Sequence, residues 1–472
     1  MKESPENNKI GAVLVVGGGI GGIQASLDLA ELGFKVYLVD RCPAMGGVMA
    51  QLDKTFPTND CSMCILSPKL VECGRHLNIE LITCANVLEV QGEPGKFRVS
   101  IRKRARYVDP DRCTGCGDCV RACPVEISSE FDEGLINRKA IYRPYAQAVP
   151  NVFAIDKKAK PPCRTACPLG TNVQGYIALI AQGKFEESFE LIKEVNALPV
   201  TCGRICTHPC EVECERGRVD EPLAIRALKR FATDYARSVK REPQPKLERA
   251  KGEKVALIGS GPAGLTCAHD LAKMGYEPTI FETLPEAGGM LRVGIPEYRL
   301  PKNVLQTEIE EICSLGVEIK TNTPVKDLEE MFNLGYKAIF LGTGAQKSQK
   351  MGIPGEEAEG VIHALDFLKQ VNLGGKVDLG DRVAIIGGGN AAIDAARVAL
   401  RLGAKDVAII YRRSRAEMPA IRTEIKEAER EGVKIHFLAA PVRVLTRGGR
   451  LAGIECIRMG LGEPDASGRP RP

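Results

Sequence analysis

The fold is decided by the stretch KVALIGSGPAG, residues 254–264. An apolar strand runs into a turn of the form G-x-G-x-x-G. A helical pattern follows to about Met274, and a second apolar strand covers Pro278–Glu282. In such a unit the first glycine makes the tight turn, the second lets a pyrophosphate approach the backbone, and the third lets helix and strand pack closely. The stretch therefore predicts a Rossmann-type βαβ unit that binds a dinucleotide.

The same pattern occurs in two other places. One copy runs from Ala12–Val16 to Lys35–Asp40, and the other runs from Arg382–Ile386 to Asp406–Arg413. Three copies predict an α/β chain built on several Rossmann-type domains. The residues expected to bind the dinucleotides are the turn residues and those at the ends of the second strands: Gly17, Gly19, Gly22, Asp40, Gly47, Gly259, Gly261, Gly264, Glu282, Gly289, Gly387, Gly389, Asn390, Arg412 and Arg413.

The end of each second strand indicates which dinucleotide binds. Asp40 and Glu282 place a carboxylate where it can accept hydrogen bonds from a ribose, which suits FAD or NAD. The third unit instead ends in Tyr411-Arg412-Arg413, and two guanidinium groups there favour a 2′-phosphate and hence NADP(H). The alternative is that these arginines only form a solvated strand end. We expect one or two FAD molecules and NADP(H).

Cysteines form a second signal, because most of the 18 lie in clusters. Cys113, Cys116, Cys119 and Cys123-Pro124 have the C-x2-C-x2-C-x3-C-P spacing of a ferredoxin, which binds 4Fe-4S clusters. Ten thiolates suffice for two all-cysteine cubanes and leave two over. Gly203 and Pro209 favour loops around the later cysteines, and structural thiols or zinc are the alternative there. The other expected ligands are Cys163, Cys167, Cys202, Cys206, Cys210 and Cys214.

A further pair, Cys61 and Cys64, is the candidate catalytic dithiol. Beside a flavin, a C-x-x-C pair can pass electrons to a disulfide. The pair can equally join Cys73 and Cys42 as ligands of another cluster, or be inert. The single cysteines, Cys84, Cys267, Cys313 and Cys456, have apolar neighbours and are expected in the core.

Composition excludes several classes of protein. A length of 472 residues suggests about three domains at roughly 150 residues each. A net charge of +5 is too small to indicate binding of nucleic acid or of an anionic membrane. The longest uncharged apolar run, residues 10–24, contains six glycines and makes a poor membrane span. We therefore expect a cytoplasmic protein, in which thiols stay reduced.

The expected domains are an FAD-type Rossmann segment (1–108), a ferredoxin-like segment (109–155), a helical iron–sulfur domain (156–250), an FAD domain (251–350) and an NADP(H) domain (351–450). A Pro- and Lys-rich joint, Lys240–Lys251, precedes the FAD domain. Residues 451–472 begin a return to the flavin sheet that is not completed, which suggests an incomplete chain or a split protein.

Two resemblances cover nearly the whole chain. Residues 11–150, with the motif GGVMAQLDKTFPTNDC at 46–61 and the ferredoxin run, resemble the A-type subunit of heterodisulfide reductase. Residues 160–472 resemble the glutamate synthase small subunit, the large subunit of NADH-dependent ferredoxin:NADP oxidoreductase and the amino-terminal half of dihydropyrimidine dehydrogenase. The motifs that carry this second resemblance are Cys163-x3-Cys167-Pro168, CGRIC at 202–206, the turn Gly259–Gly264, GIPEYRLP at 294–301 and Tyr411-Arg412-Arg413. The segment LGTGA at 341–345 resembles the Ala-Thr-Gly motif of disulfide-reductase-like flavoproteins.

The motifs together predict an electron-transfer function. NADPH gives two electrons as hydride and iron–sulfur clusters carry single electrons, so a flavin is needed between them. The resemblances imply an anaerobic complex whose partners are ferredoxin or other redox subunits, with flavin-based bifurcation as a further expectation. The alternatives are an NADPH-dependent disulfide reductase that uses Cys61 and Cys64, and an electron-wire subunit without turnover of its own.

Overall fold

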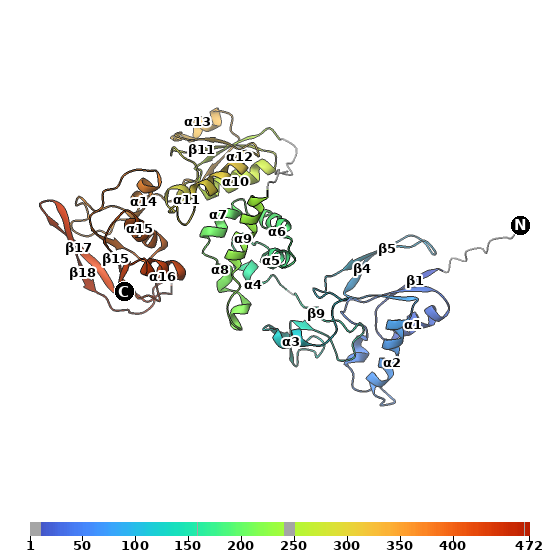
Figure 1. Cartoon of the computed structure of the whole chain (residues 1–472). Helices are drawn as coiled ribbons and strands as arrows, with labels where there is room; N and C mark the ends of the chain where they lie inside the picture. Colours follow the sequence, from blue (N-terminus) through green and yellow to red (C-terminus); the bar gives the residue numbers. More distant parts are fainter. Residues whose placement is uncertain (1–10, 158, 240–250, 467) are drawn as a thin grey trace. The chain divides into compact units, whose positions relative to one another are not determined.

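The computed structural model describes residues 11–157, 159–239, 251–466 and 468–472 (Figure 1). The chain divides into two compact units, Met1–Lys160 with Glu215–Pro222, and Pro161–Cys214 with Leu223–Pro472. The expected joint at Lys240–Lys251 falls almost entirely on residues 240–250 and lies outside the described residues.

The first unit is built on a parallel sheet of order β1-β2-β3: β1 (Ala12–Val16), β2 (Lys35–Val39) and β3 (Ile79–Ile82). Two helices supply its core, α1 (Ile20–Glu31) through Ile23 and α2 (Ser62–Arg75) through Leu66 and Leu70. The other elements are η1 (Gly47–Gln51), β4 (Ala85–Gln91), β5 (Arg98–Lys103), α3 (Asp118–Ala122), β6 (Glu126–Ser128), β7 (Asn137–Lys139), β8 (Ile141–Tyr142), β9 (Ala154–Ile155) and η2 (Glu215–Arg218).

The second unit opens with a group of helices that the sequence pattern predicts. Tyr176 is fully buried at their centre, and its hydroxyl donates to the carbonyl of Ile225 over 3.1 Å. Gly203 does not form the expected loop, because it lies inside a helix. The lack of a side chain there lets another helix approach, since a Cβ at Gly203 would lie 3.0 Å from the Cα of Arg230. The helices are α4 (Pro162–Thr165), α5 (Val173–Ala181), α6 (Phe185–Lys193), α7 (Pro199–Ile205), α8 (Pro209–Val212) and α9 (Ile225–Ser238).

Two further parallel sheets follow in the same unit. The first has the order β12-β11-β10-β13, from β10 (Lys254–Ile258), β11 (Glu277–Phe281), β12 (Glu318–Lys320) and β13 (Ala338–Leu341). The second has the order β14-β15-β16, from β14 (Arg382–Ile386), β15 (Asp406–Tyr411) and β16 (Lys434–Phe437). Helices around them are α10 (Pro262–Lys273), α11 (Met290–Val293), α12 (Lys302–Cys313), α13 (Leu328–Asn333), α14 (Ala364–Asn372), α15 (Asn390–Arg401) and α16 (Arg422–Arg430).

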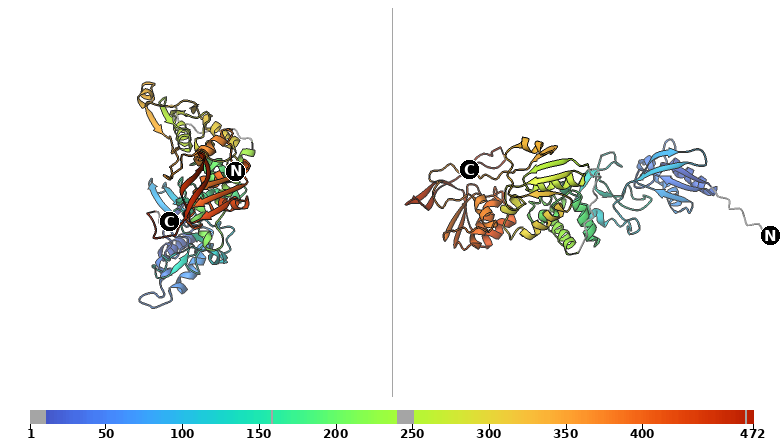
Figure 2. Two further views of the ribbon diagram at one scale, coloured as in Figure 1. Left: turned by 90° about the vertical axis from the view of Figure 1, so that its left-hand side faces the viewer. Right: turned by 90° about the horizontal axis from the view of Figure 1, so that it is seen from above.

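An antiparallel ribbon, β17 (Ala439–Arg447) with β18 (Arg450–Arg458), follows the last parallel strand (Figure 2, red). Cys456 is exposed on this ribbon, so the expectation that it belongs to the core is wrong. The three βαβ units and the α/β class are confirmed, and the predicted strands of these units begin and end within two residues of those observed.

The helical group shares a core with the sheet that contains β10. Leu198 and Val200, at the start of α7, pack in the same buried cluster as Leu257 and Leu305. Glu308 on α12 reinforces this contact. Its buried carboxylate accepts hydrogen bonds from the backbone amides of Val200, over 2.7 Å, and Thr201, over 2.9 Å. Since these amides open α7, one carboxylate satisfies donors that have no partner within their own helix.

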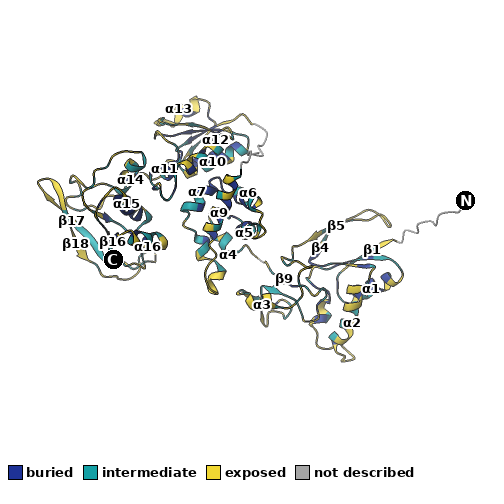
Figure 3. Ribbon diagram, viewed as in Figure 1, coloured by how far each residue is buried: buried dark blue, intermediate teal, exposed yellow. Residues whose placement is uncertain are grey.

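The sheets containing β10 and β14 are joined by a buried ion pair. Arg299, in the loop before α12, donates to Asp394 on α15 over 2.7 Å, and both side chains are less than a tenth exposed. Figure 3 shows α15 as largely buried. Arg397 lies on the ring of Tyr298, the residue next to Arg299, and pairs with Glu424 and Glu431. Buried ion pairs and a ring contact therefore join the two sheets.

Replacing Asp394 tests this connection. Asp394→Asn leaves Arg299 buried with Glu424 at 3.6 Å as its remaining carboxylate, and we expect a loss of about 3–5 kcal/mol in the free energy of unfolding. The matched control is Asp381→Asn, which breaks an exposed pair with Lys405 and should cost at most about 1 kcal/mol. Urea unfolding measures both, and equal losses in the two variants would contradict the assignment.

Candidate functional site

The glycine turns of the three βαβ units have the same backbone geometry. The first glycine of each has a left-handed φ: 108° at Gly17, 103° at Gly259 and 131° at Gly387. The second glycine of each is the extended N-cap of the following helix, and a Cβ there would meet nothing within 4 Å at Gly19, Gly261 or Gly389. Open space over a helix N-terminus is the arrangement that admits a pyrophosphate.

The first two turns differ from the last at the third glycine position of the motif. A Cβ at Gly22 would lie 1.8 Å from the oxygen of Gly17, and one at Gly264 would lie 2.0 Å from the oxygen of Gly259. Glycine is therefore the residue these two positions accept. In the third unit Ala392 takes the same place, which shows that its helix leaves room for a methyl group.

Gly47 and Gly289 each lie close against one of the first two turns. A Cβ at Gly47 would lie 2.9 Å from the Cα of Gly19, and one at Gly289 would lie 2.7 Å from the Cα of Gly261. The third unit uses an amide instead, since Asn390 accepts from the backbone amide of Ile421 over 3.0 Å. The chain thus carries two nucleotide turns of one kind and one of another.

The carboxylates expected at the ribose lie against these turns. Asp40 accepts from the backbone amides of Gly18 and Cys42. Glu282 is buried and accepts from the amide and hydroxyl of Ser260 and from the amide of Leu284, over 2.6–2.9 Å. Each carboxylate oxygen can accept more than one hydrogen bond, so a ribose hydroxyl can still be bound.

The turn at Gly259 also has the LGTGA segment against it. A Cβ at Gly259 would lie 2.5 Å from the oxygen of Gly342, and the amide of Gly342 donates to Ile258 over 2.8 Å. Within the described residues β1 pairs with β2 alone, so the turn at Gly17 has no such strand beside it. The turn of the second βαβ unit, at Gly259, therefore has more of the expected dinucleotide site around it than the turn at Gly17.

The two arginines at the end of β15 differ. Arg412 is exposed, whereas Arg413 is buried and donates to the carbonyl of Pro470 over 2.8 Å and to Asp465 over 2.5 Å. A cavity of about 600 Å³ lies beside them, and it is also lined by Arg469 and Arg471. Sequence reasoning missed these last two, and the signal was the alternation of arginine and proline at 469–472.

The ferredoxin run forms a loop with its cysteines near the surface. Gly115 and Gly117 have left-handed φ values of 73° and 85°, and α3 starts directly afterwards. Cys113, Cys116, Cys119 and Cys123 are free thiols, each exposed or half-buried. The glycines turn the chain between the first three cysteines, so the loop can wrap around a ligand.

The other cysteines, called here the helical cysteine group, come from α4, α7, α8 and the residues that follow them: Cys163, Cys167, Cys202, Cys206, Cys210 and Cys214. The regularly spaced cysteines do not lie on one continuous helix. His208, with a left-handed φ of 48°, lies between α7 and α8. Burial is the main reason that the pKa of Cys210 is raised to about 11; Lys229 opposes this rise, and Cys206, Glu211 and Cys167 add to it. Burial raises the pKa of Cys163 as well, and so do the charges of Cys214 and Cys167. The sulfurs therefore interact across helices.

The donor set fits iron–sulfur clusters. All ten expected ligands are free thiols, the ligand type that Fe–S clusters select. Within the described ranges no three His, Cys, Asp or Glu side chains converge closely enough to hold a single metal ion. A cubane binds each thiolate at a different iron, so its ligands lie farther apart than those of one ion.

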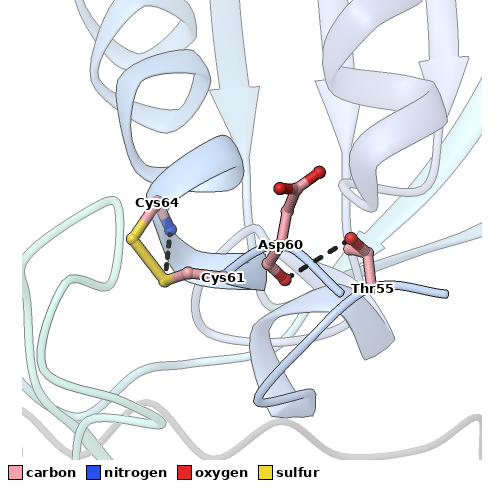
Figure 4. The surroundings of a disulfide bond; sticks show 4 residues. All are labelled: Thr55, Asp60, Cys61 and Cys64. Carbon is pink, nitrogen blue, oxygen red and sulfur yellow. Dashed lines mark hydrogen bonds between the residues drawn. A yellow bond between two sulfur atoms is a disulfide. The ribbon is translucent and has the colours of Figure 1, made fainter. Parts of the chain in front are cut away.

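Cys61 and Cys64 form a disulfide at the start of α2 (Figure 4). Cys61 is the N-cap of the helix, and its sulfur accepts from the amide of Cys64. Cys73 is buried, with its thiol 3.9 Å from the sulfur of Met45, and burial raises its pKa to about 11. The pair is thus present as a disulfide, the oxidised form that the dithiol alternative requires, and the cluster alternative with Cys73 and Cys42 stays a prediction.

Most of the chain matches known protein families. Residues 253–459 match the pyridine nucleotide-disulphide oxidoreductase family, and residues 157–241 match the family of dihydropyrimidine dehydrogenase domain II with its 4Fe-4S cluster. Residues 12–60 match the FAD dependent oxidoreductase family, and residues 106–127 match the 4Fe-4S binding domain. No helix among the described residues is both long and apolar enough to cross a membrane.

Individual relatives agree with both resemblances. The small chain of NADPH glutamate synthase from Escherichia coli is 35% identical over 70% of this chain and 74% of its own length. The beta subunit of NADP(+)-dependent formate dehydrogenase from Moorella thermoacetica is 48% identical over 66% of this chain and 48% of its own length. An A-type iron–sulfur subunit of CoB–CoM heterodisulfide reductase from Methanopyrus kandleri is 62% identical over 142 residues, 30% of this chain and 22% of its own length. The chain spans about half the length of the curated relatives it matches first.

The open space above Gly261 gives a test of flavin binding. In Gly261→Ala the new methyl group occupies space that is otherwise free, so the chain should fold normally while flavin affinity falls by about 1–3 kcal/mol, or roughly 5- to 150-fold. Gly380→Ala, which also meets nothing within 4 Å, is the control. Flavin content after dialysis measures the effect, and unchanged flavin in the Gly261 variant would contradict the site.

Proposed function

The chain belongs to the family of the glutamate synthase small chain, a group of NAD(P)H-dependent flavin and iron–sulfur oxidoreductases, and on that premise we propose that it passes electrons from NADPH through FAD to 4Fe-4S clusters. The observation that carries the proposal is the continuity of the second unit. Arg299 and Asp394 join the sheet β14-β15-β16, expected to bind NADP(H) and called here the NADP(H)-type unit, to the sheet that contains β10, expected to bind FAD and called here the FAD-type unit. Glu308 joins the FAD-type unit to α7 of the helical cysteine group. The three expected cofactors would thus be held by one compact body.

The residues of each part have distinct roles in this proposal. Gly387, Gly389 and Asn390 would hold the pyrophosphate of NADP(H), with Arg412 at the 2′-phosphate. Arg413 would hold Asp465 and Pro470 beside it, because its guanidinium is bonded to both. Gly259, Gly261, Gly264, Glu282 and Gly289 would hold FAD, which when bound accepts hydride and releases single electrons.

The buried junction at the start of α7 would position the flavin and the cluster and exclude water between them. The start of α7 is fixed by two backbone hydrogen bonds to Glu308, and its apolar residues lie in the core of the FAD-type unit. Cys202 lies on this helix and Cys206 directly follows it. A fixed, buried junction of this kind keeps the distance between a flavin and a cluster constant, which single-electron transfer requires.

The first unit would add a second nucleotide site and a ferredoxin-type cluster. Gly17, Gly19, Gly22, Asp40 and Gly47 repeat the geometry of the FAD-type turn, and Cys113, Cys116, Cys119 and Cys123 would hold the cluster. Two relatives are named as beta subunits, which supports ferredoxin or other redox subunits as partners. A second flavin together with a second group of clusters would permit electron bifurcation.

Anaerobic mixing with NADPH tests the proposal. We expect the flavin absorbance and then the cluster absorbance to bleach, because electrons should pass from the flavin to the thiolate-bound irons. Stopped-flow spectra follow both signals. Reconstituted protein in which the flavin is reduced while every cluster stays oxidised would count against the electron path.

The choice of nicotinamide has its own test. Arg412→Ala removes a charged donor, so the KM for NADPH should rise by roughly 10- to 150-fold while the KM for NADH stays the same. Arg382→Ala, an exposed arginine on the neighbouring strand β14, is the control and should change neither value. Equal effects of Arg412→Ala on both nucleotides would exclude a role at the 2′-phosphate.

A second candidate function, NADPH-dependent disulfide reduction, is favoured by the bond between Cys61 and Cys64. If this dithiol turns over, NADPH should generate two additional alkylatable thiols per chain, and the double variant Cys61→Ser/Cys64→Ser should generate none. Mass spectrometry after alkylation counts them. Reduction of the clusters without new thiols would leave electron transfer as the function and exclude the reductase.

A further inference from the structure

One buried side chain of α9 breaks the apolar character of its helix face. The buried residues of this helix are Ile225, Lys229, Ala232, Thr233 and Ala236, which lie on one side at helical spacing. Lys229 is 8% exposed. Lysine is almost never buried without a partner, since removing an ammonium from water costs several kcal/mol. A charge of opposite sign is therefore expected close to it.

Among the described residues, no carboxylate supplies that charge. In the part of the chain that the structure describes, the Lys229 ammonium makes no hydrogen bond and no ion pair. The nearby carboxylates have other partners: Glu211 accepts from the backbone amide of Arg226, and Asp234 pairs with Arg204 and Arg230. Glu308 accepts its three hydrogen bonds from Val200 and Thr201. Lys229 is thus not bonded to any of these three carboxylates.

Cysteines lie on the helices around this lysine. Cys202 is on α7 and the buried Cys210 is on α8, and Cys163 packs against the same buried cluster as Cys210. Helices α7 and α8 both contact α9, and Cys210 lies in the same buried cluster as Ile225 and Ala232. Arg226, one turn earlier on α9, donates to the carbonyl of Cys206 over 3.1 Å. The inner face of α9 thus points at the helical cysteine group.

We propose that Lys229 is the internal counter-ion of the iron–sulfur cluster held by the helical cysteine group and that it raises the reduction potential of this cluster. The inference rests on the proposed function, because it requires that cluster to be present. Thiolates and inorganic sulfide give a cluster net negative charge, and each added electron increases it. A buried cation lowers the cost of that electron, and net charge and solvent exposure both set cluster potentials.

The role of Lys229 is therefore one of tuning. The potential of this cluster would be raised relative to the ferredoxin-type cluster of the first unit, whose cysteines are exposed or half-buried and are interspersed with Asp118 and Arg121, themselves exposed and paired with each other. Electrons leaving the flavin would be stabilised first at the helical cysteine group.

Redox titration of anaerobically purified variants, followed by electron paramagnetic resonance, tests the proposal. At the potential that half-reduces the cluster in the wild-type protein, Lys229→Met should lower the ratio of reduced to oxidised cluster about tenfold, equivalent to 59 mV for one electron. Lys229→Arg, which keeps the charge, should leave the ratio within about twofold. Lys184→Met, at an exposed position before α6, is the control for a lysine of the same domain outside the cluster environment.

Three results would overturn the proposal. Unchanged potentials in Lys229→Met, with wild-type iron content, would exclude a counter-ion. Loss of iron in Lys229→Met would assign the lysine to holding the cluster. Destabilisation of the cluster-free chain by both Lys229→Met and Lys229→Gln would make the residue structural, since relief of an unpaired buried charge should leave the cluster-free melting temperature unchanged or higher. A wild-type protein without iron would instead contradict the proposed function.

Discussion

The structure depends on the absence of a Cβ where each flavin-type helix meets its glycine turn. The helices α1 and α10 approach so closely that a methyl group at Gly22 or Gly264 would overlap a backbone oxygen of its own turn. This contact fixes the helix axis to the strand and leaves the amides of the helix N-terminus facing open space. At the third turn Ala392 takes the position, and the turn is held by Asn390 and Ile421 instead. A small steric difference thus separates two kinds of nucleotide frame in one chain.

In the second compact unit, two buried carboxylates join the FAD-type unit to its neighbours on either side. Asp394 receives Arg299 from the FAD-type unit, and Glu308 receives the amides that open α7. Both contacts are out of water, so both are stronger and less adaptable than surface pairs. The packing therefore fixes the order of three parts: the sheet expected to bind NADP(H), the sheet expected to bind FAD, and the cysteine helices. This order suits the electron transfer proposed above.

Local patterns predicted the skeleton well, because glycine spacing and apolar periodicity act over a few residues. The strands β1, β10 and β14 start and end where the sequence indicates. Contacts between distant residues escaped prediction. Glu308 lies 108 residues from Val200, and Arg413 lies 52 residues from Asp465, so no short pattern reveals that these groups are bonded to each other. At Gly203 the local signal misled, since glycine favours a loop, whereas here it is inside a helix and its missing side chain makes room for Arg230. For Cys61 and Cys64 the sequence left three alternatives, and the structure shows the two sulfurs bonded to each other.

The central claim is that this polypeptide holds flavin and iron–sulfur clusters together. The most direct measurement is the iron, acid-labile sulfide and flavin content per chain of protein purified without oxygen. The account predicts about eight or more iron atoms with equal sulfide, because ten thiolates suffice for two cubanes, and at least one flavin. A colourless protein with neither iron nor flavin would contradict it.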